Sequence, residues 1–295
     1  MKGILQKKKF FIVIVFLLII VQTIPVQASN HIIRVASHSY KQGNYIYYCT
    51  QKGIERFNIK TRRHNLFISD KYKGKDTNGF RDLNIKGNYI YCSYDLQLGS
   101  SDNRVYVYRI RKNGKKIKLD SGHSPLVIGN WIYYIKSKFI TESDFTYQQD
   151  IGIYKMKLDG SSKTKVSNYP YIMGATKSNL LVYNGAKIKT IDLKNNKIQR
   201  EIRLDRAYTN GNWSYICEGA MKVGGNVYTW SENSIIGGKN FIYQVSNEAY
   251  IKEYDILGDW MIVRVNTSGR KYNSYIYGIK MDGTKKILLA KWWDV

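Results

Sequence analysis

The sequence predicts an all-β fold built from repeated four-stranded antiparallel units. The first observation is a phrase that recurs six times in the 295 residues: a small residue, Asn or Asp, then an aromatic-rich apolar run. A second signature, an apolar–polar alternation that ends near a turn, follows each copy. No window shows a sustained apolar stripe at helical spacing. Repeats at about 40–50 residues are typical of solenoids, propellers and arrays.

The recurrent phrase predicts a tight turn followed by the second strand of each unit. Its clearest copies read Gly-Asn-Tyr-Ile-Tyr-Tyr and Gly-Asn-Trp-Ile-Tyr-Tyr. Because both faces of this run are apolar, we expect a strand that is sandwiched between neighbouring sheets, with tyrosine rings filling the gap. The copies lie at 43–48, 87–92, 129–134, 178–183, 225–228 (or 211–215) and 258–263.

The second signature predicts the third and fourth strands. Residues 153–160 alternate apolar and polar side chains and close on Asp-Gly, which indicates a strand and a hairpin turn. The next strand carries lysines, as in 115–118 and 163–165, which protect an edge from pairing with other chains. Short apolar stretches such as 126–128 supply the first strand.

Four-stranded units of this length are blades, so we expect a six-bladed β-propeller of four-stranded antiparallel blades. Residues 32–35 would close it by pairing beside 286–289. Two alternatives stay open. A seventh blade results if Gly211 and Gly225 open separate units, and an open β-solenoid would use the same strands.

Residues 1–28 predict a secretory signal peptide. Four lysines precede an apolar run at 10–21, and small residues near 25–28 offer a cleavage site. The run is shorter than the roughly 20 residues of a membrane span, although an uncleaved anchor is the alternative. We therefore expect a single domain at 29–295, without a further membrane span, that is secreted and extracellular or associated with the cell wall.

The charge predicts an anionic partner. The chain carries +25, and residues 29–295 keep 43 basic against 22 acidic residues, a net charge of +21. Such a field attracts polyanions. Candidate partners are an acidic protein surface or an anionic cell-wall polymer or glycan; nucleic acid is not expected, and the chain is expected to be a monomer. The alternative is compositional, since the lysines are spread along the chain.

Cysteine and histidine give no sign of a metal or cofactor site. The three cysteines, Cys49, Cys92 and Cys217, are an odd number, and the four histidines are isolated. Cys49 and Cys92 sit one register step apart in matching strands, so their thiols are expected to point different ways. Buried free thiols are the main expectation and a Cys49–Cys92 bridge is the alternative.

The residues 129–134, followed by 153–161, resemble the repeat of bacterial secreted propellers that are similar to the propeller of low-density-lipoprotein-receptor-related proteins. The resemblance covers nearly all of 29–295 and is closest in the third blade. It implies a six-bladed propeller exported by a Gram-positive-like bacterium, and no agreed activity. The receptor propellers carry a Tyr-Trp-Thr-Asp motif that is absent here, which puts receptor-type ligand binding in doubt.

Catalytic groups in propellers lie where first strands line the central channel, and Asp82 and Asp255 qualify by position. A pair of carboxylates could serve glycoside hydrolysis, whereas a solvated or arginine-paired acid is the commoner role. Nucleophile motifs and phosphate-binding glycine loops are missing.

Binding residues are expected on three insertions, 71–78, 139–150 and 231–240, because loops on a rigid scaffold often carry function. Lys71 and Lys73 make the first basic. Phe145 and Tyr147 in the second could stack on sugars or grip a protein, or tuck back onto their own blade. The sequence thus favours a non-enzymatic binding or scaffold propeller at the bacterial cell envelope. The alternatives are an exported glycan- or peptide-acting enzyme and a sensor or stabilising module of a surface complex.

Overall fold

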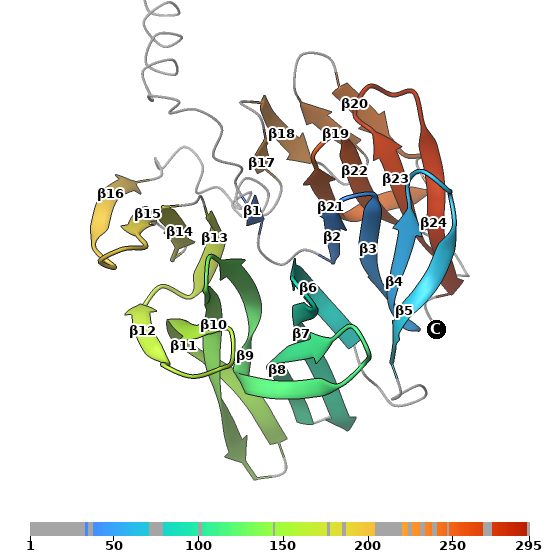
Figure 1. Ribbon diagram of the computed structural model, residues 1–295. Coiled ribbons are helices and arrows are strands. Elements are labelled where there is room, and N and C mark those ends of the chain that lie inside the picture. The colour runs from blue at the N-terminus through green and yellow to red at the C-terminus, as the bar shows by residue number, and fades with distance from the viewer. Residues whose placement is uncertain are drawn as a thin grey trace, which may run out of the picture. The chain divides into compact units, whose positions relative to one another are not determined.

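The computed structural model describes thirteen segments of the chain, and their regular structure is all strand. The segments are 33–34, 38–70, 79–99, 102–143, 145–175, 178–184, 187–203, 220–223, 226–230, 234–237, 241–246, 248–267 and 273–293. They form strands β1 to β24 (Figure 1). The chain divides into the units Met1–Asn30 and His31–Val295, and every strand belongs to the second unit. The predicted signal peptide lies outside the described residues.

The predicted all-β class is confirmed, with antiparallel sheets whose strands follow chain order. Within the described segments, no helix is long and apolar enough to cross a membrane. Three sheets have four strands each. Their strands are β2 (Ser39–Gln42), β3 (Tyr45–Thr50), β4 (Gly53–Asn58) and β5 (His64–Ser69); β17 (Ala220–Val223), β18 (Asn226–Trp230), β19 (Ser234–Gly237) and β20 (Phe241–Gln244); and β21 (Ala249–Leu257), β22 (Trp260–Thr267), β23 (Asn273–Lys280) and β24 (Lys286–Trp293).

A larger sheet holds seven strands, because one long strand belongs to two successive meanders. Strand β9 pairs with β8 through its first half and with β10 through its second half. Gly122 lies at the changeover at φ 136°, where a Cβ would collide with the carbonyl of Ile135. The strands are β6 (Gly79–Lys86), β7 (Tyr89–Gly99), β8 (Asp102–Arg111), β9 (Lys116–Ile128), β10 (Trp131–Glu142), β11 (Phe145–Lys157) and β12 (Thr164–Ser167).

The fifth sheet shows that the predicted closure by residues 32–35 is wrong. Its order is β1 (Ile33–Arg34), β13 (Tyr171–Ala175), β14 (Asn179–Tyr183), β15 (Lys187–Asp192) and β16 (Ile198–Arg203). Ile33 pairs with Ala175 rather than with 286–289, where β24 pairs with β23. Two residues form too short a ladder for their apolar pattern to select a partner.

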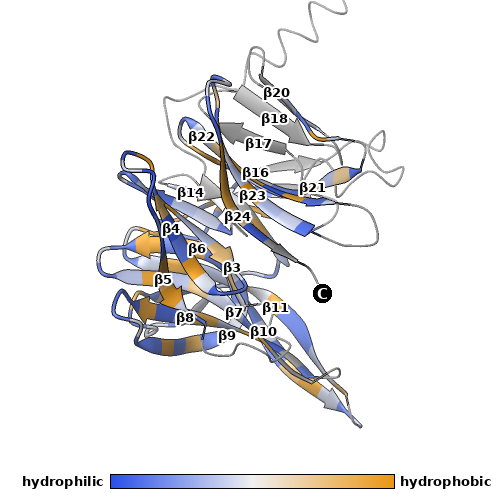
Figure 2. Cartoon of the chain, turned by 90° about the vertical axis from the view of Figure 1, so that its right-hand side faces the viewer, coloured by the Kyte–Doolittle hydropathy of each residue, from blue (hydrophilic) through white to orange (hydrophobic). Residues whose placement is uncertain are grey.

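The aromatic second strands are buried on both faces, as predicted. Four consecutive residues of β3 are buried, and Tyr48 and Tyr134 lie fully inside. Their hydroxyls find acceptors, Tyr48 at the carbonyl of Leu289 (3.0 Å) and Tyr134 at Oδ2 of Asp120 (2.6 Å). In Figure 2 orange, pale and blue segments alternate along the strands, and the turns between them are mostly blue. A tyrosine whose hydroxyl is hydrogen-bonded can be buried at this position without leaving an unpaired polar group.

Apolar clusters lie between most of the sheets that follow one another in the chain. Clusters lie between β3–β5 and β6–β8, between β7–β8 and β10–β11, and between β9–β11 and β13–β15. Others join β19–β20 to β21–β23 and β22–β24 to β3–β4, so the last sheet packs against the first. Cys49 and Cys92 share the first cluster, because β3 and β7 face each other across it. Both are buried free thiols as predicted. Because they face each other from neighbouring sheets, the two thiols lie on opposite faces of their matching strands, as expected.

Candidate functional site

The first strands of four units carry a β-bulge, three of them in successive units and the fourth in the last unit. The register shifts between Arg81 and Asn84 in β6, between His123 and Leu126 in β9, in β13 after Ile172 and in β21 after Ile251. A bulge adds a residue and re-aims side chains, and bulges are frequent beside active sites. Asp82 and Ser124 occupy these bulges at φ 59° and 51°, a left-handed conformation that is uncommon for such residues. The bulges therefore define a set of equivalent positions.

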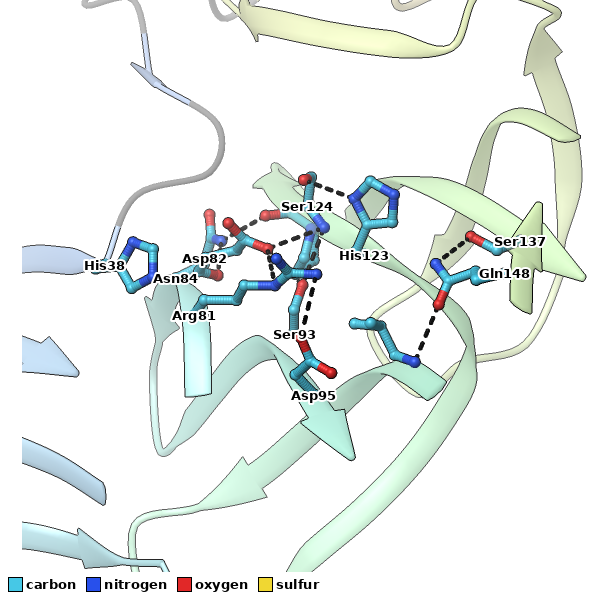
Figure 3. Close-up of polar contacts among 12 residues, drawn as sticks. His38, Arg81, Asp82, Asn84, Ser93, Asp95, His123, Ser124, Ser137 and Gln148 are labelled. Atoms are coloured by element: carbon cyan, nitrogen blue, oxygen red, sulfur yellow. Dashed lines mark hydrogen bonds and ion pairs between the residues drawn. The ribbon is translucent and has the colours of Figure 1, made fainter. Parts of the chain in front are cut away.

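Asp82 is buried at the centre of the first polar cluster, where its carboxylate joins β6 to β7 and β9. Oδ2 accepts the hydroxyl of Ser93 (2.5 Å) and the backbone N–H of Ser124 (3.1 Å). Asp82 is 3% exposed. Arg81 lies beside it, 3.9 Å from Asp82 and 3.9 Å from Asp95 (Figure 3). Asp82 thus acts as a structural acceptor between strands.

Asn84 makes a second link between the same two first strands. Its side-chain amide donates to the carbonyl of Pro125 (2.7 Å), and its oxygen accepts the backbone N–H of Val127 (3.1 Å). The side-chain amide of Asn84 therefore bonds the backbone of β9, with which β6 forms no ladder among the described strands. The polar side chains of β6 beside the bulge therefore form hydrogen bonds with β9 rather than with solvent.

His123 contacts both Ser124 and Asp150, and these three residues are the strongest catalytic candidates in the cluster. Its Nδ1 lies 3.0 Å from the hydroxyl of Ser124, and its Nε2 lies 3.2 Å from both carboxylate oxygens of Asp150 (Figure 3). Ser137 donates to Asp150 (2.6 Å), and Gln148 donates to Ser137 (2.7 Å). Burial raises the pKa of Asp150, but hydrogen bonds from His123, Ser137 and Gln148 outweigh it and hold that pKa below its usual range. An ionised Asp150 can stabilise a protonated His123.

Asp255 lies in a second polar cluster, between the first and last sheets. The hydroxyl of Ser39 donates to Oδ2 of Asp255 at 2.5 Å. Beside it, Glu253 pairs with Nδ1 of His38 (2.8 Å) and Nε of Arg264 (3.1 Å). These residues line a cavity of about 10 Å³, which is room for one water.

The two predicted acids therefore belong to separate clusters. Asp82 bonds β7 and β9, whereas Asp255 bonds β2, and both side chains are buried. Sequence reasoning missed the arrangement of His123, Ser124 and Asp150, because the serine and the aspartate are brought together only by the pairing of β9, β10 and β11.

The three predicted insertions have different outcomes. Residues 71–78, with Lys71 and Lys73, lie outside the described residues, as do 231–233 and 238–240. Residues 139–150 are predicted as a loop, and this is wrong. Residues 139–142 and 145–150 form the paired outer ends of β10 and β11, where Thr141 pairs with Thr146. The alternation of Phe139 to Glu142 already carries the strand pattern.

Phe145 and Tyr147 lie on this rigid hairpin and stack on each other. Their ring centroids are 6.1 Å apart at an interplanar angle of 26°, and Phe145 is 52% exposed. The hydroxyl of Tyr147 donates to Glu142 at 3.0 Å. Thr146 pairs with Asp102, so the hairpin is held against β8. The binding role of the two rings stays a prediction.

No protein-family model matches the chain, and no curated protein matches its sequence. Solved structures with loosely similar backbones are propeller-like proteins. One is a prolyl endopeptidase, with TM-score 0.45, 10% identity and coverage of 90% of this chain and 50% of that one. The N-terminal domain of Nup159 gives TM-score 0.41 and 9% identity over 87% of this chain and 83% of that one. Kluyveromyces lactis Hsv2p gives 0.38 and 11% over 88% and 85%. This chain spans half the length of the prolyl endopeptidase. At these TM-scores the similarities assign no function to this chain.

Proposed function

We propose that the chain is a six-bladed β-propeller of four-stranded antiparallel blades. Dividing the seven-stranded sheet at β9 yields two blades, β6–β9 and β9–β12. With the other four sheets this makes six units in chain order. The apolar cluster between the last and first sheets supports a closed ring, as do the bonds from Ser39 to Asp255 and from Tyr48 to Leu289.

The chain is further proposed to be a monomeric, secreted protein of the bacterial propeller family similar to low-density-lipoprotein-receptor-related domains. The recurrent aromatic phrase supports the family, and the basic and apolar start of residues 1–28 supports export by a signal peptide. A protein exported in this way would act outside the cell or at its wall. Its partner would then be a component of the envelope.

Its proposed function is non-enzymatic binding of an anionic polymer, or of an acidic protein, at that envelope. The observation that supports this function is the different placement of the acidic and the basic residues. The two first-strand acids, Asp82 and Asp255, are buried and bonded between sheets. Among the residues whose burial the structure describes, no lysine or arginine is buried, and the net charge of +21 over 29–295 attracts polyanions.

Binding to an acidic polysaccharide at rising salt tests this proposal. The affinity of the purified protein for polygalacturonate is expected to fall at least about tenfold between roughly 0.1 M and 1 M NaCl, since the Debye length shrinks from about 10 Å to about 3 Å. Pullulan, a neutral glycan, serves as the control and should not be bound. Failure to bind any acidic polymer, or an affinity that ignores salt, would overturn the proposal.

A hydrolytic enzyme is the second candidate, favoured by the chain of contacts from Ser124 through His123 to Asp150. In this function His123 takes the proton of the Ser124 hydroxyl as the oxygen attacks an ester or amide carbonyl, and Asp150 stabilises the imidazolium. A fluorophosphonate probe should label the wild-type protein and a Ser121→Ala control, but not Ser124→Ala. A wild-type protein that takes no label would exclude this candidate.

A further inference from the structure

Basic side chains gather in the turns that join the third and fourth strands of the units. The turn between β4 and β5 carries three of them, Lys60, Arg62 and Arg63, all exposed. Among the described residues no ion pair engages these three. Equivalent turns follow in the other units and can be located in Figure 1. Further exposed lysines on or beside them are Lys115 between β8 and β9, Lys157 at the end of β11, Lys163 between β11 and β12, Lys194 and Lys197 between β15 and β16, and Lys285 between β23 and β24.

These turns lie at one end of the sheets, together with the turns that join first and second strands. Backbone bonds tie the two kinds of turn within a unit, as between Ile59 and Asn44 (2.8 Å) and between Lys112 and Asn88 (3.1 Å). We call this surface the turn end, defined by the Asx-containing turns before each second and fourth strand.

Side-chain contacts join the turn ends of three pairs of neighbouring units. Lys41 contacts Asp259 at 3.5 Å between the first and last sheets. Lys155 donates to Asn196 at 3.2 Å between the β11 and β15 units. Lys86 donates to the carbonyl of Gly129 and the side chain of Asn130, and so links the turns before β7 and β10.

Most acids of the turn end are committed to holding the turns themselves. Asp159 accepts the backbone N–H of Ser161 (2.9 Å), Asp192 that of Lys194 (2.6 Å) and Asp282 that of Thr284 (2.9 Å). Asx side chains that cap the backbone in this way fix a turn. The lysines are therefore displayed on a preorganised backbone, which lowers the entropy lost on binding.

The opposite end differs in charge. There the hairpins between second and third strands carry Glu55, Asp102 and Glu142, against Lys52, Arg104, Lys187 and Lys189. Arg104 is itself bonded to Asp102 at 2.7 and 2.8 Å. Protection of sheet edges alone explains lysines on outer strands. It does not explain why one end of the sheets is basic while the other is nearly balanced by acids.

We propose that the turn end is the binding surface for a linear acidic polysaccharide. This inference rests on the proposed binding function and deepens it. Cationic turns that recur from unit to unit complement a chain whose anions also recur, and the uncommitted group Lys60, Arg62 and Arg63 is the strongest contact. Guanidinium and ammonium groups bind carboxylates by charge-assisted hydrogen bonds.

Two matched triple variants test the assignment with polygalacturonate as the probe. One removes turn-end charge: Lys60→Gln, Arg63→Gln and Lys115→Gln. The other removes the same charge elsewhere: Lys52→Gln, Lys138→Gln and Lys252→Gln, which are also exposed. Arg62 is left in place because its φ is 57° and a substitution there could disturb the turn. Unfolding midpoints in urea check that both variants fold.

The turn-end variant is expected to lose about tenfold or more in affinity and to show a weaker salt dependence, whereas the matched variant stays within about twofold. An equal loss in both variants overturns the assignment to the turn end and leaves the binding function standing. A wild-type protein that does not bind polygalacturonate removes both. Tighter binding of single-stranded DNA through the same residues would overturn the polysaccharide as the occupant.

Discussion

The backbone N–H of Ser124 donates to Oδ2 of Asp82 at 3.1 Å, so the bulge of β9 is fastened to the bulge of β6. The hydroxyl of Ser39 donates to Asp255 in a similar way between β2 and β21. A bulge takes a backbone group out of the ladder, and a buried group without a partner costs free energy. A carboxylate on the neighbouring first strand accepts a hydrogen bond from that backbone group. The two acids that looked catalytic by position thus hold successive sheets together.

Replacing Asp82 by alanine is expected to destabilise the fold strongly. The change leaves the Ser93 hydroxyl buried without its acceptor and removes one of the two acceptors of the Ser124 N–H, which keeps only the Ser93 oxygen at 2.9 Å; the loss costs about 2–4 kcal/mol in the free energy of unfolding. Asp259→Ala is the control, since Asp259 is 60% exposed and its contact with Lys41 is worth about 0–1 kcal/mol. Urea unfolding compares the two. Equal stability of both variants would show that the Asp82 cluster is not structural.

Ser39 and Asp255 should be coupled across the seam between the first and last sheets. A double-mutant cycle with Ser39→Ala and Asp255→Asn is expected to give an interaction energy of about 1–2 kcal/mol, because the 2.5 Å bond is buried and charge-assisted. Free energies of unfolding from denaturant titration supply the four corners of the cycle. Additive effects would mean that this bond does not close the ring.

Asp120 should make stability depend on pH in a defined direction. Burial raises its pKa, but bonds from Lys136 (2.8 Å) and Tyr134 (2.6 Å) outweigh this and lower the pKa in the folded state. A lowered folded pKa means that the stabilisation is complete above the unfolded value of about 3.9 and is lost as pH falls through the folded value. Asp120→Asn should therefore be less stable than wild type at pH 7, by about 1–2 kcal/mol.

The same two proteins should converge in acid. Below about pH 4 Asp120 of the unfolded chain becomes protonated while the folded carboxyl stays ionised, so the difference in unfolding free energy should shrink as pH falls towards the lowered folded pKa. Thermal or urea unfolding at pH 7, 5 and 3 measures it. A gap that is constant across this range would show that the charge on Asp120 contributes nothing.

The aromatic phrase was enough to predict the strands and their burial. Tyr48 and Tyr134 are buried because a run such as Tyr-Ile-Tyr-Tyr offers apolar surface on both faces. The weakened copy at 179–183 is informative too. Strand β14 alternates buried and half-buried residues, as its sequence Asn-Leu-Leu-Val-Tyr suggests. Local pattern and burial agree because both depend on what lies on either side of one strand.

The polar clusters could not be predicted in the same way. His123 and Asp150 are 27 residues apart and meet only because β9 leaves one meander and enters the next. The length of β9 depends on pairing with both β8 and β10, which no local window contains. The partner of Ile33 was mistaken for a related reason. Its two-residue strand carries too little pattern to distinguish one open sheet edge from another.

Phe145 offers a test of whether an exposed ring serves binding rather than folding. Phe145→Ala is expected to change the free energy of unfolding by less than about 0.5 kcal/mol, because the ring is half exposed and stacks only against Tyr147. Phe139→Ala on the same hairpin is the contrast. Its ring packs edge-on against Tyr106 (5.3 Å) under the guanidinium of Arg104 (5.7 Å), so its loss should cost about 1–2 kcal/mol. If Phe145 binds a sugar, its removal weakens glycan binding while stability is kept. A large loss of stability in Phe145→Ala would assign the ring to the fold.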